Sequence, residues 1–97
     1  MNLSGIPAIV TGGASGLGEA TARLLAENGA KVAIFDVQIE KAQQVAQEIG
    51  GLAFSCDVTS AESAEQAFSA AKEAHGACAI AVNCAGIGVP SKILGKD

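Results

Sequence analysis

Glycines cluster near the start of the chain, where residues 11–18 read Thr-Gly-Gly-Ala-Ser-Gly-Leu-Gly. A phosphate needs hydrogen-bond donors and room, and glycine supplies both because its missing Cβ lets backbone N–H groups approach. We expect Gly12 at the tight turn, Gly16 at the close approach to the ligand and Gly18 at the helix–strand contact. Their spacing, Gly-x-x-x-Gly-x-Gly, departs from the common dinucleotide fingerprint, so the cluster alone leaves a plain structural turn open.

An acidic residue follows the glycines at the sequence distance at which dinucleotide-binding proteins place a ribose ligand. Asp36 ends an apolar run 18 residues after Gly18. A carboxylate at that place accepts hydrogen bonds from the ribose hydroxyls of an adenosine and repels a 2′-phosphate. Neither Val37 nor Ser15 offers the positive charge that a 2′-phosphate requires, so the pattern predicts NAD as the cofactor rather than NADP. The alternative is that Asp36 is only a solvated turn residue.

Two later segments place polar groups after apolar runs. Asp57-Val58 follows one run, and residues 83–86 read Asn-Cys-Ala-Gly after the next. Asp57 can accept a hydrogen bond from the adenine amino group, and the Val58 backbone can meet the edge of the ring. Taken alone, the first segment favours a helix-entry turn and the second an ordinary turn at the end of a strand.

The elements that must position these groups alternate regularly along the chain. Apolar runs predict four strands, at Ile6–Thr11, Lys31–Asp36, Leu52–Cys56 and Ala79–Asn83. Apolar residues at helical spacing predict a helix in each interval, the first ended by Gly29 and the third capped by Thr59 or Ser60. This pattern is typical of an α/β protein with a Rossmann-type doubly wound parallel sheet. We expect strand order 3-2-1-4, with the ligand beyond the carboxyl ends, at the switch point between the first and fourth strands.

Composition narrows the classes of partner. The 97 residues carry a net charge of −4 and no basic cluster, which argues against nucleic acid and against an anionic membrane surface. We find no signal-peptide pattern and no apolar stretch of about 20 residues that could span a bilayer, so we expect a cytoplasmic protein. The three cysteines lack metal-ligand spacing and read as reduced thiols, so no metal site is expected.

Together the four landmarks resemble the short-chain dehydrogenase/reductase family. The glycine turn, Asp36, Asp57-Val58 and the Asn83–Gly86 segment occur in the family order and run through the whole chain. The subgroup most similar in its motifs is the type 2 3-hydroxyacyl-CoA dehydrogenases. That subgroup is similar at residues 82–87, Val-Asn-Cys-Ala-Gly-Ile, where Cys84 replaces the second Asn of the wider family.

The resemblance implies hydride transfer between NAD and a secondary alcohol or ketone, in this subgroup a 3-hydroxyacyl-CoA thioester, by a homotetramer. It implies NAD contacts from Ser15, Leu17, Asp36, Asp57, Val58 and Cys84. With the motif residues added, the candidate cofactor-binding set is Gly12, Ser15, Gly16, Leu17, Gly18, Asp36, Asp57, Val58, Asn83, Cys84, Ala85 and Gly86.

One departure limits the resemblance. The family's catalysis uses a Ser, a Tyr and a Lys, with the last two in a Tyr-x-x-x-Lys segment, and this sequence contains no Tyr. We therefore expect no catalytic residue here. Residues 1–97 are expected to form the NAD-binding N-terminal portion of one domain, ending after the fourth strand, with an exposed strand edge and marginal stability in isolation. The alternatives are a non-catalytic NAD-binding module or sensor, and an α/β domain that binds no ligand.

Overall fold

A computed structural model describes residues 2–14, 16–57 and 59–84. The elements are β1 (Pro7–Thr11), α1 (Gly16–Glu27), β2 (Lys31–Asp36), α2 (Ile39–Ile49), β3 (Leu52–Ser55), α3 (Ala61–His75) and β4 (Ile80–Asn83). All pairings are parallel, and the strands lie in the order β3-β2-β1-β4. The predicted fold class and strand order are therefore confirmed. The predicted strand bounds were too long by one residue at Ile6, Cys56 and Ala79.

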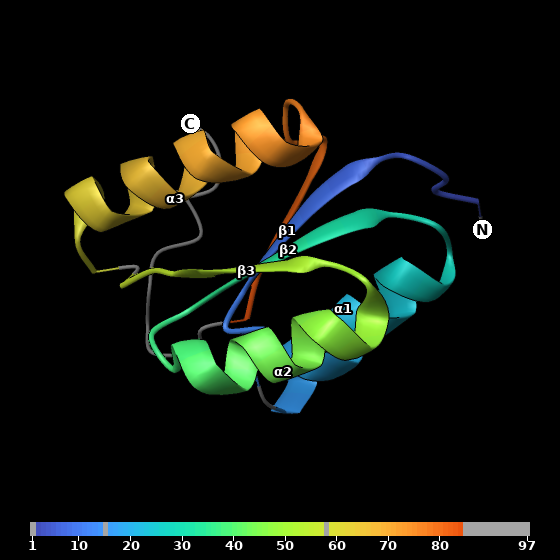
Figure 1. Cartoon of the computed structure of the whole chain (residues 1–97), viewed down its shortest axis with the longest axis horizontal. Coiled ribbons are helices and arrows are strands. Elements are labelled where there is room, and N and C mark those ends of the chain that lie inside the picture. The colour runs from blue at the N-terminus through green and yellow to red at the C-terminus, as the bar shows by residue number, and fades with distance from the viewer. Residues whose placement is uncertain (1, 15, 58, 85–97) are drawn as a thin grey trace.

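Helices cover the sheet on both faces, with α1 and α2 on one side and α3 on the other (Figure 1). Alternate residues of each strand point to opposite faces because the side-chain period of a strand is two. In β2, Val32 and Ile34 meet the helix pair, whereas Ala33 and Phe35 meet α3. Both β1 and β2 are consequently buried on two faces, which explains why their sequences are continuously apolar.

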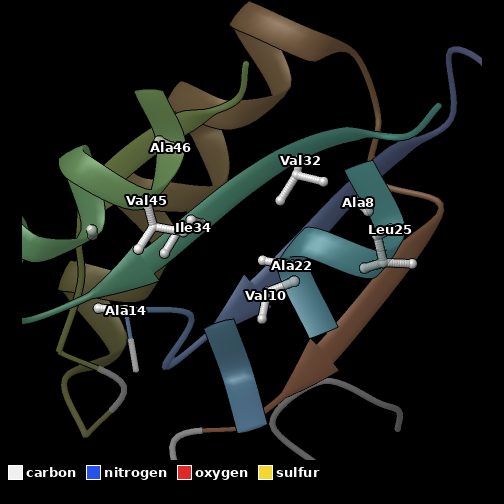
Figure 2. Packing of buried hydrophobic residues seen from close by; sticks show 10 residues of the cluster. Ala8, Val10, Ala14, Ala22, Leu25, Val32, Ile34, Val45 and Ala46 are labelled. Carbon is white, nitrogen blue, oxygen red and sulfur yellow. The ribbon is translucent and has the colours of Figure 1, made fainter. Parts of the chain in front are cut away.

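The face under α1 and α2 is packed with small and β-branched side chains, and Figure 2 shows this cluster from close by. Val10 and Ile34 are fully buried beneath Ala22 of α1 and Val45 of α2. Small residues on the helices let their backbones approach the sheet closely. The glycine turn that joins β1 to α1 is thus held against a closely packed part of the molecule.

The opposite face is built around the aromatic ring of Phe35. That ring makes edge-on contacts with Phe54 of β3 and Phe68 of α3, at centroid separations of 5.9 and 5.2 Å. Of the two residues considered as the cap of α3, Ser60 is the one whose side chain accepts a hydrogen bond, from Ser63 N at 3.2 Å. These contacts fix the start of α3 beside the carboxyl end of β3.

The fourth strand lies beside β1 with Thr11 opposite Asn83. No described residue pairs with the other side of β4, and Ala81 is exposed there. In the same described part of the chain, none of the helices has the length and apolar character needed to cross a membrane.

Candidate dinucleotide-binding site

The glycine turn has the stereochemistry that its three named glycines were expected to supply. Gly12 has φ +71° and donates its N–H to Phe35 O at 2.7 Å, which ties the turn to β2. A Cβ on Gly16, whose φ is +59°, would meet no atom of the described residues within 4 Å, so they leave the space beside it open. A Cβ on Gly18 would lie 1.9 Å from Gly12 O, so α1 packs backbone to backbone against the turn.

A fourth glycine matters that the sequence interpretation left without a role. A Cβ on Gly13 would lie 2.9 Å from Ile34 Cγ2 and 3.3 Å from Val10 Cγ1. The side chains of two strands therefore fill the space where a larger residue would go. In the sequence, the position of Gly13 directly after Gly12 was the only hint of this role. The clash of a larger residue with Ile34 and Val10 depends on how β1 and β2 pack.

Open space beside Gly16 adjoins the N-terminus of α1. The first backbone N–H groups of a helix have no partner within the helix, and the helix dipole makes that end electropositive. Leu17, in the first turn, leaves 77% of its surface exposed, so nothing in the described part of the chain covers this end. The arrangement is an anion site of the kind that dinucleotide pyrophosphates use.

Asp36 lies at the end of β2 and is half-buried. Its Oδ2 accepts a hydrogen bond from Ala14 N in the glycine turn at 3.2 Å. Its Oδ1 accepts one from Gln38 N at 2.9 Å. Asp36 is therefore more than a solvated turn residue, since its carboxylate joins the turn after β1 to the loop after β2.

Asp57 has a different setting, exposed beyond the end of β3. Its Oδ1 accepts hydrogen bonds from Thr59 Oγ1 at 2.6 Å and from Thr59 N at 2.9 Å, and these bonds lower the pKa of the Asp57 carboxyl. The helix-entry turn anticipated at this segment is present. The other carboxylate oxygen, Oδ2, makes no hydrogen bond to a described residue and faces solvent with the rest of the side chain.

Asn83 ends β4 beside the glycine turn. The buried Thr11 donates from Oγ1 to Asn83 Oδ1 at 2.8 Å, and Thr11 O accepts from Cys84 N at 2.9 Å. Cys84 itself is half-buried against the core below α1. These bonds hold the carboxyl ends of β1 and β4 together.

The candidate residues that the structure describes thus gather at the carboxyl end of the sheet, because the carboxyl ends of parallel strands lie side by side (Figure 1). Asp36 touches the glycine turn and Asn83 touches Thr11, while Cys56 N donates to Asp36 O at 3.3 Å and brings the segment of Asp57 alongside. Four of the candidates, Ser15, Val58, Ala85 and Gly86, lie outside the described residues. Contact of any candidate with NAD remains a prediction.

The cysteines of the chain are all free. Cys56 is buried just after β3, and burial raises the pKa of its thiol. Cys78 is exposed as a residue, but partial desolvation of its thiol also raises the pKa. A raised pKa keeps a thiol protonated and unreactive at neutral pH. Across the described ranges, no group of three His, Cys, Asp or Glu side chains could hold a metal ion.

A family model described as short chain dehydrogenase matches residues 7–96. The chain belongs to this family, as the four landmarks indicated. Zerumbone synthase of Zingiber zerumbet is 50% identical over 91 residues, which cover 90% of this chain and 34% of that protein. The 3-hydroxyacyl-CoA dehydrogenase type-2 of Homo sapiens is 40% identical over 93 residues, covering 94% of this chain and 36% of that protein. The chain spans about a third of the length of the curated relatives that it matches.

Solved structures show the same architecture. A structure described as ribose-5-phosphate isomerase from Brucella melitensis 16M has a TM-score of 0.84 at 37% identity, over 90% of this chain and 35% of that one. The 3-ketoacyl-(acyl-carrier-protein) reductase from Brucella melitensis, complexed with NADH, has a TM-score of 0.80 at 36% identity, over 82% of this chain and 34% of that one. One name denotes an isomerase and the other a reductase, so the shared fold alone does not define the reaction.

Proposed function

We propose that residues 1–97 form the NAD-binding portion of a short-chain dehydrogenase. One observation carries this proposal: the carboxylate of Asp36 touches the glycine turn, through Ala14 N at 3.2 Å, beside the open N-terminus of α1. A ribose and a pyrophosphate that are linked in one molecule need an acid and an anion site this close together. A structural turn needs neither group.

In this proposal the pyrophosphate lies over Gly16 at the start of α1, and Asp36 accepts hydrogen bonds from the adenosine ribose. Asp57 accepts from the adenine amino group, and the segment from Asn83 onward lies toward the nicotinamide. Bound NAD supplies a ring that accepts a hydride from the substrate carbon. The residues of this chain bind and orient the cofactor for that transfer.

The preference for NAD over NADP rests on charge. Asp36 places a carboxylate where a 2′-phosphate would lie, and the neighbouring Val37 is apolar and 63% exposed. Glu40 and Lys41 both line the shallow depression beside Val37, so their charges offset one another. No net positive charge is therefore available from these residues to hold a 2′-phosphate.

For the whole protein we propose a secondary alcohol or ketone substrate, with 3-hydroxyacyl-CoA as the class, and a homotetrameric assembly. This rests on the motifs shared with the type 2 dehydrogenases and on relatives that carry that name. Because the sequence has no Tyr, we propose that residues 1–97 alone bind NAD but do not turn over substrate. The same observation supports the second candidate function, a non-catalytic NAD-binding module or sensor.

Calorimetric titration of the protein with NAD and with NADP tests the proposal. We expect a saturable signal with NAD and a much weaker one with NADP, because Asp36 repels the additional phosphate. Equal affinities would remove the role given to Asp36, and no binding of either would overturn the NAD site. An assay for alcohol oxidation separates the dehydrogenase from the non-catalytic module, provided that it is run on a protein whose sequence continues to a Tyr-x-x-x-Lys segment. On residues 1–97 alone, both candidates give no turnover.

A further inference from the structure

We infer that Asp36 is a positioning residue for the glycine turn as well as a ribose ligand: its carboxylate holds the turn in its binding conformation before any cofactor arrives. The ribose half of this inference rests on the proposed function, whereas the half that concerns the turn is a property of the ligand-free protein. The evidence lies in two hydrogen bonds between the turn and β2.

Those two bonds tie the turn to the end of β2 in steps of two residues. Gly12 N donates to the backbone oxygen of Phe35 at 2.7 Å, which continues the β1–β2 ladder. Ala14 N then donates to Asp36 Oδ2 at 3.2 Å, so here the acceptor is a side-chain oxygen and not a backbone carbonyl. The side chain of Asp36 thus extends the ladder past the point where the strands separate.

While the Asp36 carboxylate is in place, Ala14 N is shielded from water. Ala14 is completely buried, and its methyl group packs in the cluster beneath α1 and α2, where Figure 2 shows it beside Ile34 and Val45. A buried N–H without an acceptor is costly, so removal of the Asp36 carboxylate must shift the turn until Ala14 N finds another partner. The open space beside Gly16, two residues further on, would change with it.

The second oxygen of Asp36 explains how one carboxylate can serve both turn and ribose. Oδ1 accepts from Gln38 N at 2.9 Å, so each oxygen already holds one backbone N–H. An ionised carboxylate offers about four lone-pair sites, two on each oxygen. Among the described residues no further donor reaches either oxygen, which leaves one site on each and matches the two hydroxyl donors of a ribose. The backbone therefore orients the carboxylate in advance, and this reduces the ordering that binding would otherwise require.

The first arm of the test uses the ligand-free protein. Amide hydrogen exchange, followed by NMR, is compared in wild type, Asp36→Ala and Glu40→Gln, which removes a nearby exposed charge on α2. We expect exchange at Ala14 to be faster by on the order of tenfold in Asp36→Ala, with Ile34 at the centre of β2 unchanged and Glu40→Gln like wild type. Unchanged exchange at Ala14 in Asp36→Ala overturns the inference.

The second arm separates positioning from ribose contact. The probe is 2′,3′-dideoxyadenosine diphosphate, which keeps the adenine and the pyrophosphate but has no ribose hydroxyls. If Asp36 acted only on hydroxyls, Asp36→Ala would bind this probe as well as wild type or better, because a negative charge is gone; that result overturns the inference. We expect binding several-fold weaker in Asp36→Ala and unchanged in Glu40→Gln.

The two proposals fail separately. If wild type binds neither NAD nor the dideoxy probe, the proposed function falls, while faster exchange at Ala14 in Asp36→Ala still supports the hold on the turn. If wild type binds NAD but Asp36→Ala leaves the turn and the probe unaffected, only the positioning role falls. Should Asp36→Ala not fold, Asp36→Asn takes its place, because its single acceptor oxygen can satisfy only one of the two backbone donors.

Discussion

The two ends of the sheet differ in how they treat polar groups. At the carboxyl end, Asp36 and Asn83 hold hydrogen bonds across neighbouring chain segments, and the space beside the glycine turn is open. At the amino end, α3 closes over the strands, and His75 Nδ1 is buried with no hydrogen-bond partner in the described part of the chain. Beside it lies a largely apolar cavity of about 10 Å³ lined by Pro7 and Cys78, among others.

That contrast teaches which end can take a ligand. Among the described residues, the carboxyl end places the first N–H groups of α1 and the Asp36 carboxylate beside open space, which is what the proposed polar ligand needs. The cavity at the amino end has at most the volume of one water molecule. There burial, and secondarily the positive charge of Lys31, lower the pKa of His75 and so favour its neutral ring.

Gly18→Ala tests whether the carboxyl end is a rigid frame. The new Cβ would lie 1.9 Å from Gly12 O, which belongs to the backbone and cannot rotate away. We expect a loss of about 3 kcal/mol or more in the free energy of unfolding, measured by urea denaturation. Gly16→Ala is the matched control: it meets open space and carries only the left-handed backbone penalty of about 1 kcal/mol. Equal losses in the two variants would contradict a rigid contact at Gly18.

Asp36→Ala tests the polar groups of the same end. Loss of hydrogen bonds to a charged group should weaken NAD binding by about 1–3 kcal/mol, roughly fivefold to 150-fold, in calorimetric titration. The control is Glu40→Gln, which removes one negative charge from α2 without touching the turn. An NAD affinity that is the same in Asp36→Ala as in wild type would show that this end does not bind the ribose through its carboxylate.

The pH dependence of stability tests the amino end. Because the folded protein lowers the pKa of His75, the unfolded chain takes up the proton at a higher pH than the folded chain. The stability that the neutral ring provides is complete above the unfolded pKa, near 6.5, and is lost as pH falls from there through the folded pKa.

Urea unfolding at pH 7 and pH 5 measures this loss. Carboxylates also titrate in that range, so the informative quantity is the difference between wild type and His75→Gln. We expect the stability loss between pH 7 and pH 5 to be smaller in His75→Gln than in wild type. Equal losses would mean that burial at the amino end does not restrict the charge of His75.

Asp57→Ala should have the smallest effect. Its carboxylate is exposed and, within the described ranges, accepts hydrogen bonds from Thr59 alone, so water competes with any ligand for it. We expect NAD affinity to fall by about twofold, equivalent to roughly 0.5 kcal/mol. A loss as large as that of Asp36→Ala would show that the two acids are equivalent, against the difference in their surroundings.

Much of the fold was predictable from sequence because its signals are local. Continuous apolar runs, helical spacing and glycine stops each depend on neighbouring residues, and right-handed crossovers then restrict the strand order. The bounds were less predictable: Cys56 continues the apolar run of β3 but lies past its last ladder residue, Ser55. The likeness to known dehydrogenase motifs located Asp36 and Asn83, but not what they touch.

Sequence alone determined the fold class, the strand order, the family and the end of the sheet, its carboxyl end, at which polar residues gather. The contacts came from the tertiary structure: Asp36 holds Ala14, Ile34 and Val10 fill the space beside Gly13, and Nδ1 of the half-buried His75 is enclosed with no partner among the described residues. The physical reason is that these are contacts between segments far apart in the chain, set by side-chain direction and by a few tenths of an ångström of packing. Residue types and spacing carry no record of such distances.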